Sequence, residues 1–165
     1  QNIIDGWSRR DFISIKLLLA VIVAFVSMVM VFFTALAFGL SSGSTFDIEN
    51  IHYLGYFFIQ ALSYSMVALL FAILFKRGAL AIGVFFLYSL VLENLIAKPI
   101  SAYFDNAGRF FPLESTDVLI PLPAFENMQR QISDPPNYTV FLIVALIYLG
   151  IYTFLAVRKF ESDDL

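Results

Sequence analysis

Few residues of this chain have side chains that could carry out chemistry, and their positions exclude several classes of enzyme. The 165 residues include a single histidine, His52, and no cysteine. A metal site built on two histidines, a thiolate metal site and a disulfide are therefore excluded. No GxxxxGK[ST] P-loop is present, so the chain cannot itself bind ATP in that way. We expect a chain that is not an enzyme, with no catalytic residue and with no metal or cofactor of its own.

Glu93 is the only acid inside a long apolar stretch. A carboxylate in a membrane is costly without a partner, so such a residue is a functional candidate. Lys98 follows five residues later, about one helical turn away. Two interpretations are open: a functional group, or a carboxylate that reaches the outer interface or pairs locally with Lys98. The second interpretation is favoured.

Other polar side chains lie within the apolar stretches, near one face of each expected helix. They could line a translocation path or make contacts between helices, and packing alone explains them equally well. Together with Glu93, these residues are Ser27, Thr34, Gln60, Ser63, Tyr64, Tyr148 and Tyr152.

The composition is that of a membrane protein. Hydrophobic residues make up 60% of the chain and charged residues 14%, against about 25% charged residues in soluble domains. A helix needs about 20 apolar residues to cross the hydrocarbon core of a bilayer. We predict an all-α membrane protein with a single transmembrane domain, whose four spans cover residues 16–40, 52–75, 79–97 and 138–157.

The basic residues indicate how these spans are oriented. Lysine and arginine are enriched in cytoplasmic loops, and with four spans most of them fall on one side: Arg9, Arg10, Lys16, Lys76, Arg77, Arg158 and Lys159. Both termini are therefore predicted to be cytoplasmic. Residues 1–15 would form a cytosolic interfacial segment and residues 158–165 a cytosolic tail.

Residues 98–137 would then form an extracellular loop with helices of its own. Phe125, Met128 and Ile132 recur at helical spacing among polar residues, which predicts an amphipathic helix on the outer leaflet. Residues 113–120, bounded by two prolines, are a candidate for a second short helix. A plain surface loop is an equally good interpretation of these residues.

The opening stretch indicates a helix break followed by a new helix. Glycine accepts the left-handed conformation that ends a helix, so Asp5-Gly6 predicts the break. Ser8 can cap the next helix, and Asp11, three residues on, can reach back to it. The only tryptophan, Trp7, and the pair Arg9-Arg10 lie beside this break. We interpret the stretch as a cytosolic surface that docks against a partner; a charged anchor with no partner is the alternative.

The same stretch carries a resemblance to a known family. Gly6-Trp7-Ser8-Arg9-Arg10-Asp11-Phe12, with Lys16 after it, resembles the coupling-helix region of ABC-2 type transporter permeases. In that family a degenerate stretch of the form (G/P)-x-S-R-x-(D/E)-(F/I)-x-x-x-K links the second and third transmembrane helices. The order of features that follows, including small extracellular helices before the last span, is similar over nearly the whole chain.

The resemblance implies the permease subunit of an ATP-driven exporter in a bacterial plasma (inner) membrane. The four spans would be the third to sixth of six, with sequence missing before Gln1. It further implies a second permease subunit, identical or different, surrounding membrane lipid, and a separate ABC ATPase subunit that holds ATP-Mg. Coupling to that ATPase would pass through Asp5, Gly6, Trp7, Ser8, Arg9, Arg10 and Asp11. No nucleic acid is expected as a partner, and the alternative function is a non-transporting structural or assembly subunit.

The predicted orientation can be tested with single cysteines, because the chain has none of its own. Cysteines introduced at Ser44 and Ser133 should react with a membrane-impermeant thiol reagent added outside. Cysteines at Ser14 and Ser162 should not react, because both lie on the predicted cytosolic side. Labelling of positions 133 and 162 from the same side would contradict the four-span topology.

Overall fold

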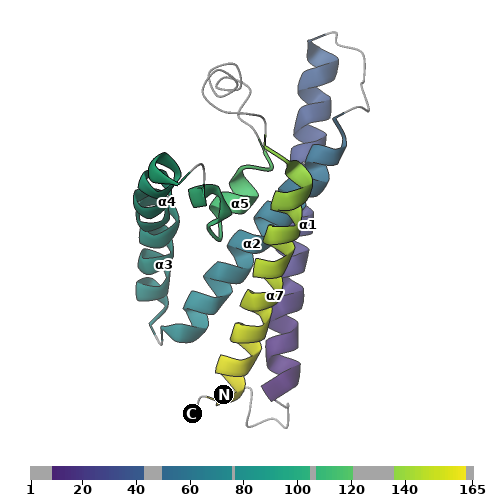
Figure 1. The fold of residues 1–165 in the computed structure, drawn as a ribbon. Helices are drawn as coiled ribbons and strands as arrows, with labels where there is room; N and C mark the ends of the chain where they lie inside the picture. The colour runs from purple at the N-terminus through teal and green to yellow at the C-terminus, as the bar shows by residue number, and fades with distance from the viewer. Residues whose placement is uncertain (1–8, 43–49, 76, 105–106, 121–135, 163–165) are drawn as a thin grey trace.

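Four long apolar helices make up most of the structure (Figure 1). The computed structural model describes residues 9–42, 50–75, 77–104, 107–120 and 136–162, and within these ranges every regular element is helical. Each long helix has the length and composition needed to cross a membrane. The predicted all-α class and the predicted number of membrane-length helices are therefore confirmed. The amphipathic helix expected around residues 125–132 lies outside the described residues, as do residues 1–8.

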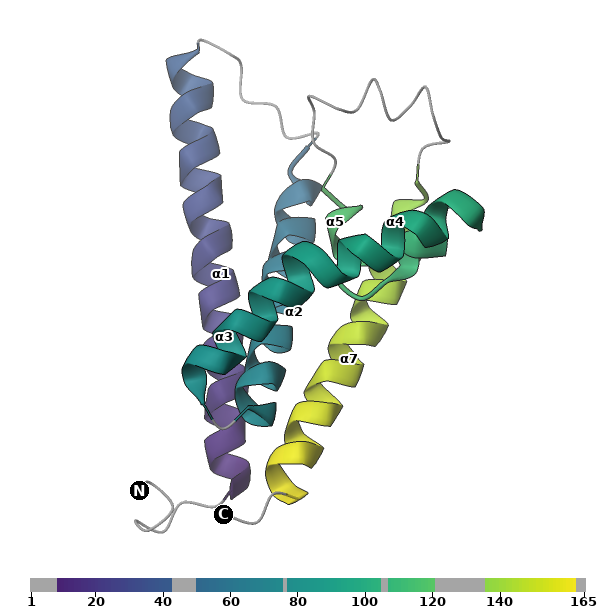
Figure 2. The ribbon, with the colours of Figure 1, turned by 90° about the vertical axis from the view of Figure 1, so that its left-hand side faces the viewer.

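The first two long helices, α1 (Arg9–Ser41) and α2 (His52–Leu74), lie side by side and run in opposite directions (Figures 1 and 2). No charged residue follows Lys16 in α1, so the helix continues as an uninterrupted apolar rod. At 1.5 Å per residue, its length is about 50 Å, against about 30 Å for the hydrocarbon core of a bilayer. The excess length requires α1 to tilt or to extend beyond the hydrocarbon.

The third membrane-length helix is composite. It consists of α3 (Gly78–Phe86), a π-helical segment η1 (Leu87–Leu92) and α4 (Glu93–Tyr103), which follow one another without interruption. The sequence predicted an end at residue 97, but the helix continues to Tyr103 through Pro99. Figure 2 shows the composite helix crossing α2 obliquely. The π-helical segment ends directly before Glu93, and such segments occur frequently at functional sites.

The last long helix, α7 (Tyr138–Ser162), packs against both α1 and α2. Its end lies beside the start of α1, because Arg10 Nε is 2.7 Å from Glu161 Oε1 and the rings of Phe12 and Phe160 stack at 5.4 Å. The turn between α2 and α3 lies at this same end of the bundle (Figure 1). We call this the paired end, since the first turns of α1 and the last turns of α7 are joined there.

The chain between α4 and α7 enters the bundle at the opposite end. Residues 107–120, here called the inserted segment, contain the 3-10 turn η2 (Ala107–Phe110) and the short helix α5 (Glu114–Asp117). The segment contacts α2, α4 and α7. The short helix lies within the range predicted for one, residues 113–120.

The burial of the inserted segment shows that it is part of the core. Leu113 is 2% exposed and packs with Met66, Val67 and Leu149 of the surrounding helices. Leu119 is fully buried with Phe141. Many large apolar side chains of the long helices are instead exposed on the outer surface, as expected where lipid is the solvent. The inserted segment is therefore better enclosed than much of the surface of the spans around it.

Candidate functional site

The candidate site is a buried polar cluster centred on Glu93, the first residue of α4. Its side chain is only 3% exposed. Oε1 accepts hydrogen bonds from the backbone N–H groups of Leu113 and Glu114, the second at 3.0 Å. The hydroxyl of Tyr88, in the π-helical segment, lies against the same carboxylate. Glu93 thus links the composite helix to the inserted segment.

This contact differs from the one that helical spacing favoured. Glu93 is buried and does not take Lys98 as its hydrogen-bonding partner; it accepts amide protons from residues about twenty positions further along the chain. Backbone N–H groups at the start of a helix have no acceptor within that helix. A carboxylate in an apolar surrounding needs donors equally. The carboxylate and the two N–H groups therefore supply one another's hydrogen-bond partners. Burying either without the other would cost more free energy.

Asp117, at the end of α5, makes the second link. Its Oδ1 accepts hydrogen bonds from Gln60 Nε2 at 2.7 Å and from the Tyr64 hydroxyl at 3.0 Å, both from α2. Burial raises the pKa of Asp117, while the hydrogen bonds from Gln60 and Tyr64 act in the opposite direction. The two donors belong to the polar face that the sequence indicated on the second span.

α7 makes the third link through a tyrosine. The Tyr148 hydroxyl donates a hydrogen bond of 3.0 Å to the backbone carbonyl of Phe110, in the inserted segment. The ring of Phe110 stacks on Phe141 of α7, with 5.0 Å between centroids. The segment is therefore held by three different helices, through side-chain groups of α2, α4 and α7.

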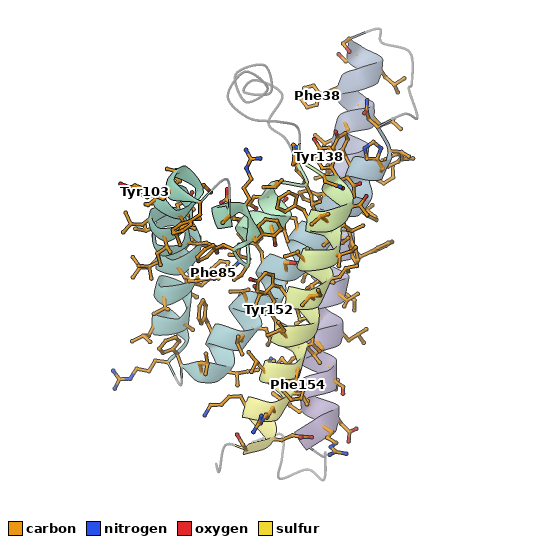
Figure 3. The ribbon with its side chains drawn as sticks, in the orientation of Figure 1. Phe38, Phe85, Tyr103, Tyr138, Tyr152 and Phe154 are labelled. Atoms are coloured by element: carbon orange, nitrogen blue, oxygen red, sulfur yellow. The ribbon has the colours of Figure 1, made fainter. Side chains whose placement is uncertain are left out.

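Three buried polar atoms of the helices around this segment have no hydrogen-bond partner within the described part of the chain. They are Ser63 Oγ, Glu93 Oε2 and the Tyr152 hydroxyl. Tyr152 stacks on Tyr148 at 6.0 Å and points into the bundle, whereas Phe154, two residues later, points outward (Figure 3). Buried polar groups without partners are rare in proteins and need an explanation.

The other predicted site residues lie outside this cluster. The hydroxyls of Ser27 and Thr34 bond to carbonyls of their own helix, at 2.9 Å and 2.8 Å. Of the predicted coupling residues, Arg9, Arg10 and Asp11 form the first turn of α1, and residues 5–8 lie outside the described ranges. Whether any of these residues lines a path or contacts an ATPase stays a prediction.

Sequence reasoning missed three members of the cluster, which are Tyr88, Glu114 and Asp117. Burial raises the pKa of Glu114, and the nearby carboxylates of Asp117 and Glu93 raise it further, while Lys98 and Arg109 lower it. A signal was present in residues 113–120, where two acids occur in a stretch with four apolar residues between two prolines. The apolar residues on both sides of these acids favour a segment that is packed instead of solvated.

The carboxylates of the cluster are not arranged as a metal site: among the described residues, no three His, Asp or Glu side chains are placed to hold a metal ion. Comparisons with known protein families, characterised proteins and solved structures find no match for this chain. The function therefore has to be argued from the residues and their geometry.

Gly108 determines how closely the inserted segment approaches α4. A Cβ atom at this position would lie only 1.9 Å from the backbone carbonyl oxygen of Ala97 and 2.5 Å from Ser101 Oγ. A backbone atom cannot move aside as a flexible side chain can. Any residue larger than glycine must therefore push the segment away from α4 and disturb the contact with Glu93.

We predict that Gly108→Ala lowers the thermal stability of the purified protein, because forcing a methyl group into a packed contact costs about 1–3 kcal/mol. Gly150→Ala is the matched control, since a Cβ there meets nothing within 4 Å and alanine is the better helix former. The comparison is made by thermal unfolding in the same detergent. Equal melting temperatures for Gly108→Ala and the wild type would show that the segment is not seated on α4.

Proposed function

We propose that the chain is the permease subunit of an ATP-driven ABC-2 type exporter, which couples ATP hydrolysis on a separate ATPase subunit to movement of a substrate across the plasma membrane. The observation that carries the proposal is the stretch from Gly6 to Lys16, which resembles the coupling region of that family and leads directly into a span. The four membrane-length helices would supply four of the six spans of such a subunit.

The start of α1 supports the proposal on mechanical grounds. α1 begins at Arg9, inside the motif, so a displacement of the motif would be passed directly to a helix that is long enough to cross the membrane. α7 would move with it, because Arg10 and Glu161 are paired and Phe12 stacks on Phe160. Motion applied at one cytosolic surface would therefore reach two helices at once.

In this proposal, ATP-Mg binding brings two ATPase subunits together, and each presses on residues 5–11 of the permease above it. The permease itself binds no nucleotide. A second permease subunit, identical or different, completes the translocation path. Both ends of the described chain meet at the paired end, which carries Arg10, Lys16, Arg77, Arg158 and Lys159. Positive charge of this kind favours the cytoplasmic side.

The proposal predicts that the geometry of the arginine pair matters, and not only its charge. The double change Arg9→Lys and Arg10→Lys keeps the charge but removes the forked contacts that a guanidinium makes. It should weaken ATPase docking, and Trp7→Ala should weaken it more, by about 2 kcal/mol or about 30-fold, as for a truncated interface anchor. Both effects are measured as ATPase affinity and ATP turnover in the reconstituted complex.

Glu161→Gln is the control that separates docking from the internal pair. It removes the carboxylate that contacts Arg10 while leaving residues 5–11 unchanged. If Glu161→Gln lowers turnover as much as the double lysine variant, the arginine effect comes from the contact with α7. If Trp7→Ala and the lysine variant both behave as the wild type, the stretch is an anchor, and a structural or assembly subunit becomes the better assignment.

A further inference from the structure

The charges around the inserted segment do not balance. The carboxyl groups of Glu93, Glu114 and Asp117 interact with one another, and the basic side chains of the described residues that act on Glu114 are Lys98 and Arg109. With all five residues ionised, the cluster carries one negative charge in excess. An excess charge next to a hydrocarbon region is costly.

One carboxylate oxygen in the cluster can accept a proton, which would cancel the excess negative charge. Oε1 of Glu93 accepts both amide protons from the inserted segment, and the Tyr88 hydroxyl acts on the same carboxylate, whereas Oε2 is buried without a hydrogen-bond partner of its own among the described residues. The buried hydroxyl of Tyr152 also lacks a partner there, and it interacts electrostatically with Glu93. A proton on Oε2 would remove the charge and leave Oε1 free to accept the same two amide bonds.

The titratable groups around the three acids come from every surrounding element. Tyr64 on α2 donates to Asp117, and Tyr88 on η1 lies against Glu93. Lys98 on α4 and Arg109 on η2 act on Glu114 of α5. On α7, Tyr152 interacts with Glu93, and Tyr148 interacts with Tyr88 and Tyr152.

We propose that this cluster binds one proton, held by the carboxyl groups of Glu93 and Asp117, and that loss of the proton releases the inserted segment from the bundle. A proton suits the site better than a metal ion, because a metal needs several oxygen ligands around it and no three acids or histidines among the described residues, including Glu93, Glu114 and Asp117, are placed to hold one. A proton needs only one carboxylate oxygen. The proposal does not depend on what the chain transports, or on whether it transports anything.

The direction of the pH effect follows from the burial of the acids. Burial raises the pKa of Asp117 and of Glu114, so the docked segment holds a proton that the released, hydrated segment would give up. Docking is then fully stabilised at low pH, below the pKa values of the released acids. The stabilisation is lost as the pH rises through the pKa of the docked acids, by up to about tenfold per pH unit for one proton.

The test uses a single cysteine inside the inserted segment of the full-length protein. Ser115 is fully buried, and Ser115→Cys changes its size little, so the thiol should react only when the segment leaves the bundle. Asn137→Cys, at an exposed position before α7, gives the reaction rate of a solvent-exposed thiol at each pH as the reference. The labelling rate at position 115 divided by the rate at position 137 should rise at least tenfold between about pH 5.5 and about pH 8.5.

Carboxylate-to-amide variants in this reporter background decide whether the cluster is responsible. Glu93→Gln mimics the protonated acid and keeps an oxygen for the two amides, so the ratio should stay low and independent of pH. Asp117→Asn should flatten the profile in the same way, and it serves if the first variant does not fold. Glu161→Gln, an acid-to-amide change at the paired end, is the matched control and should keep the profile of the parent.

Two results would overturn the proposal. One is a labelling ratio that does not change with pH in the parent protein. The other is a pH profile that persists unchanged in a folded Glu93→Gln or Asp117→Asn variant, as judged by circular dichroism and gel filtration. A failure of ATPase coupling in the experiments on Trp7 would leave these measurements unaffected, so the two proposals are tested separately.

Discussion

A carboxylate buried among apolar helices must be given hydrogen-bond donors, and Glu93 obtains its donors from a segment that belongs to no spanning helix. The same contact satisfies two backbone amides that could not otherwise be buried. Once the segment is held there, the burial of Leu113 and Leu119 follows, and so does the need for glycine at position 108. One polar contact thus accounts for the way the last loop folds back into the bundle.

The four membrane-length helices could be predicted because they depend on a local property, an uncharged apolar stretch of sufficient length. The contacts of the site could not, because they join residues far apart in the chain. Helical spacing can bring Lys98 near Glu93, but nothing in the spacing points to the amides of residues 113 and 114. Sequence spacing also gives no indication of the hydrogen bond between Asp117 and Gln60, which are 57 residues apart. The sequence grouped Gln60 with Tyr64 and Tyr148 with Tyr152, and only the structure shows what Gln60, Tyr64 and Tyr148 contact.

α7 connects the two ends of the molecule. At the paired end, Glu161 and Phe160 contact α1, and toward the other end Tyr148 holds Phe110 of the inserted segment. Under the proposed function, a push on residues 5–11 would travel through α1 and α7 to the segment, and the segment would oppose that motion while it stays docked. A bound proton would then set how firmly the outer end is closed. The coupling stretch and the buried cluster would act on one rigid helix from its two ends.

The central claim is that Glu93 holds the inserted segment inside the bundle, and amide hydrogen exchange in lipid nanodiscs tests it most directly. The amides of Leu113 and Glu114 should exchange far more slowly than those of an unstructured peptide, although both lie in a loop between spans. In Glu93→Ala, which removes the acceptor, the same two amides should return toward the unstructured rate while the amides of α2 and α7 stay protected. Fast exchange at Leu113 and Glu114 in the wild type, or unchanged protection in Glu93→Ala, would contradict the claim.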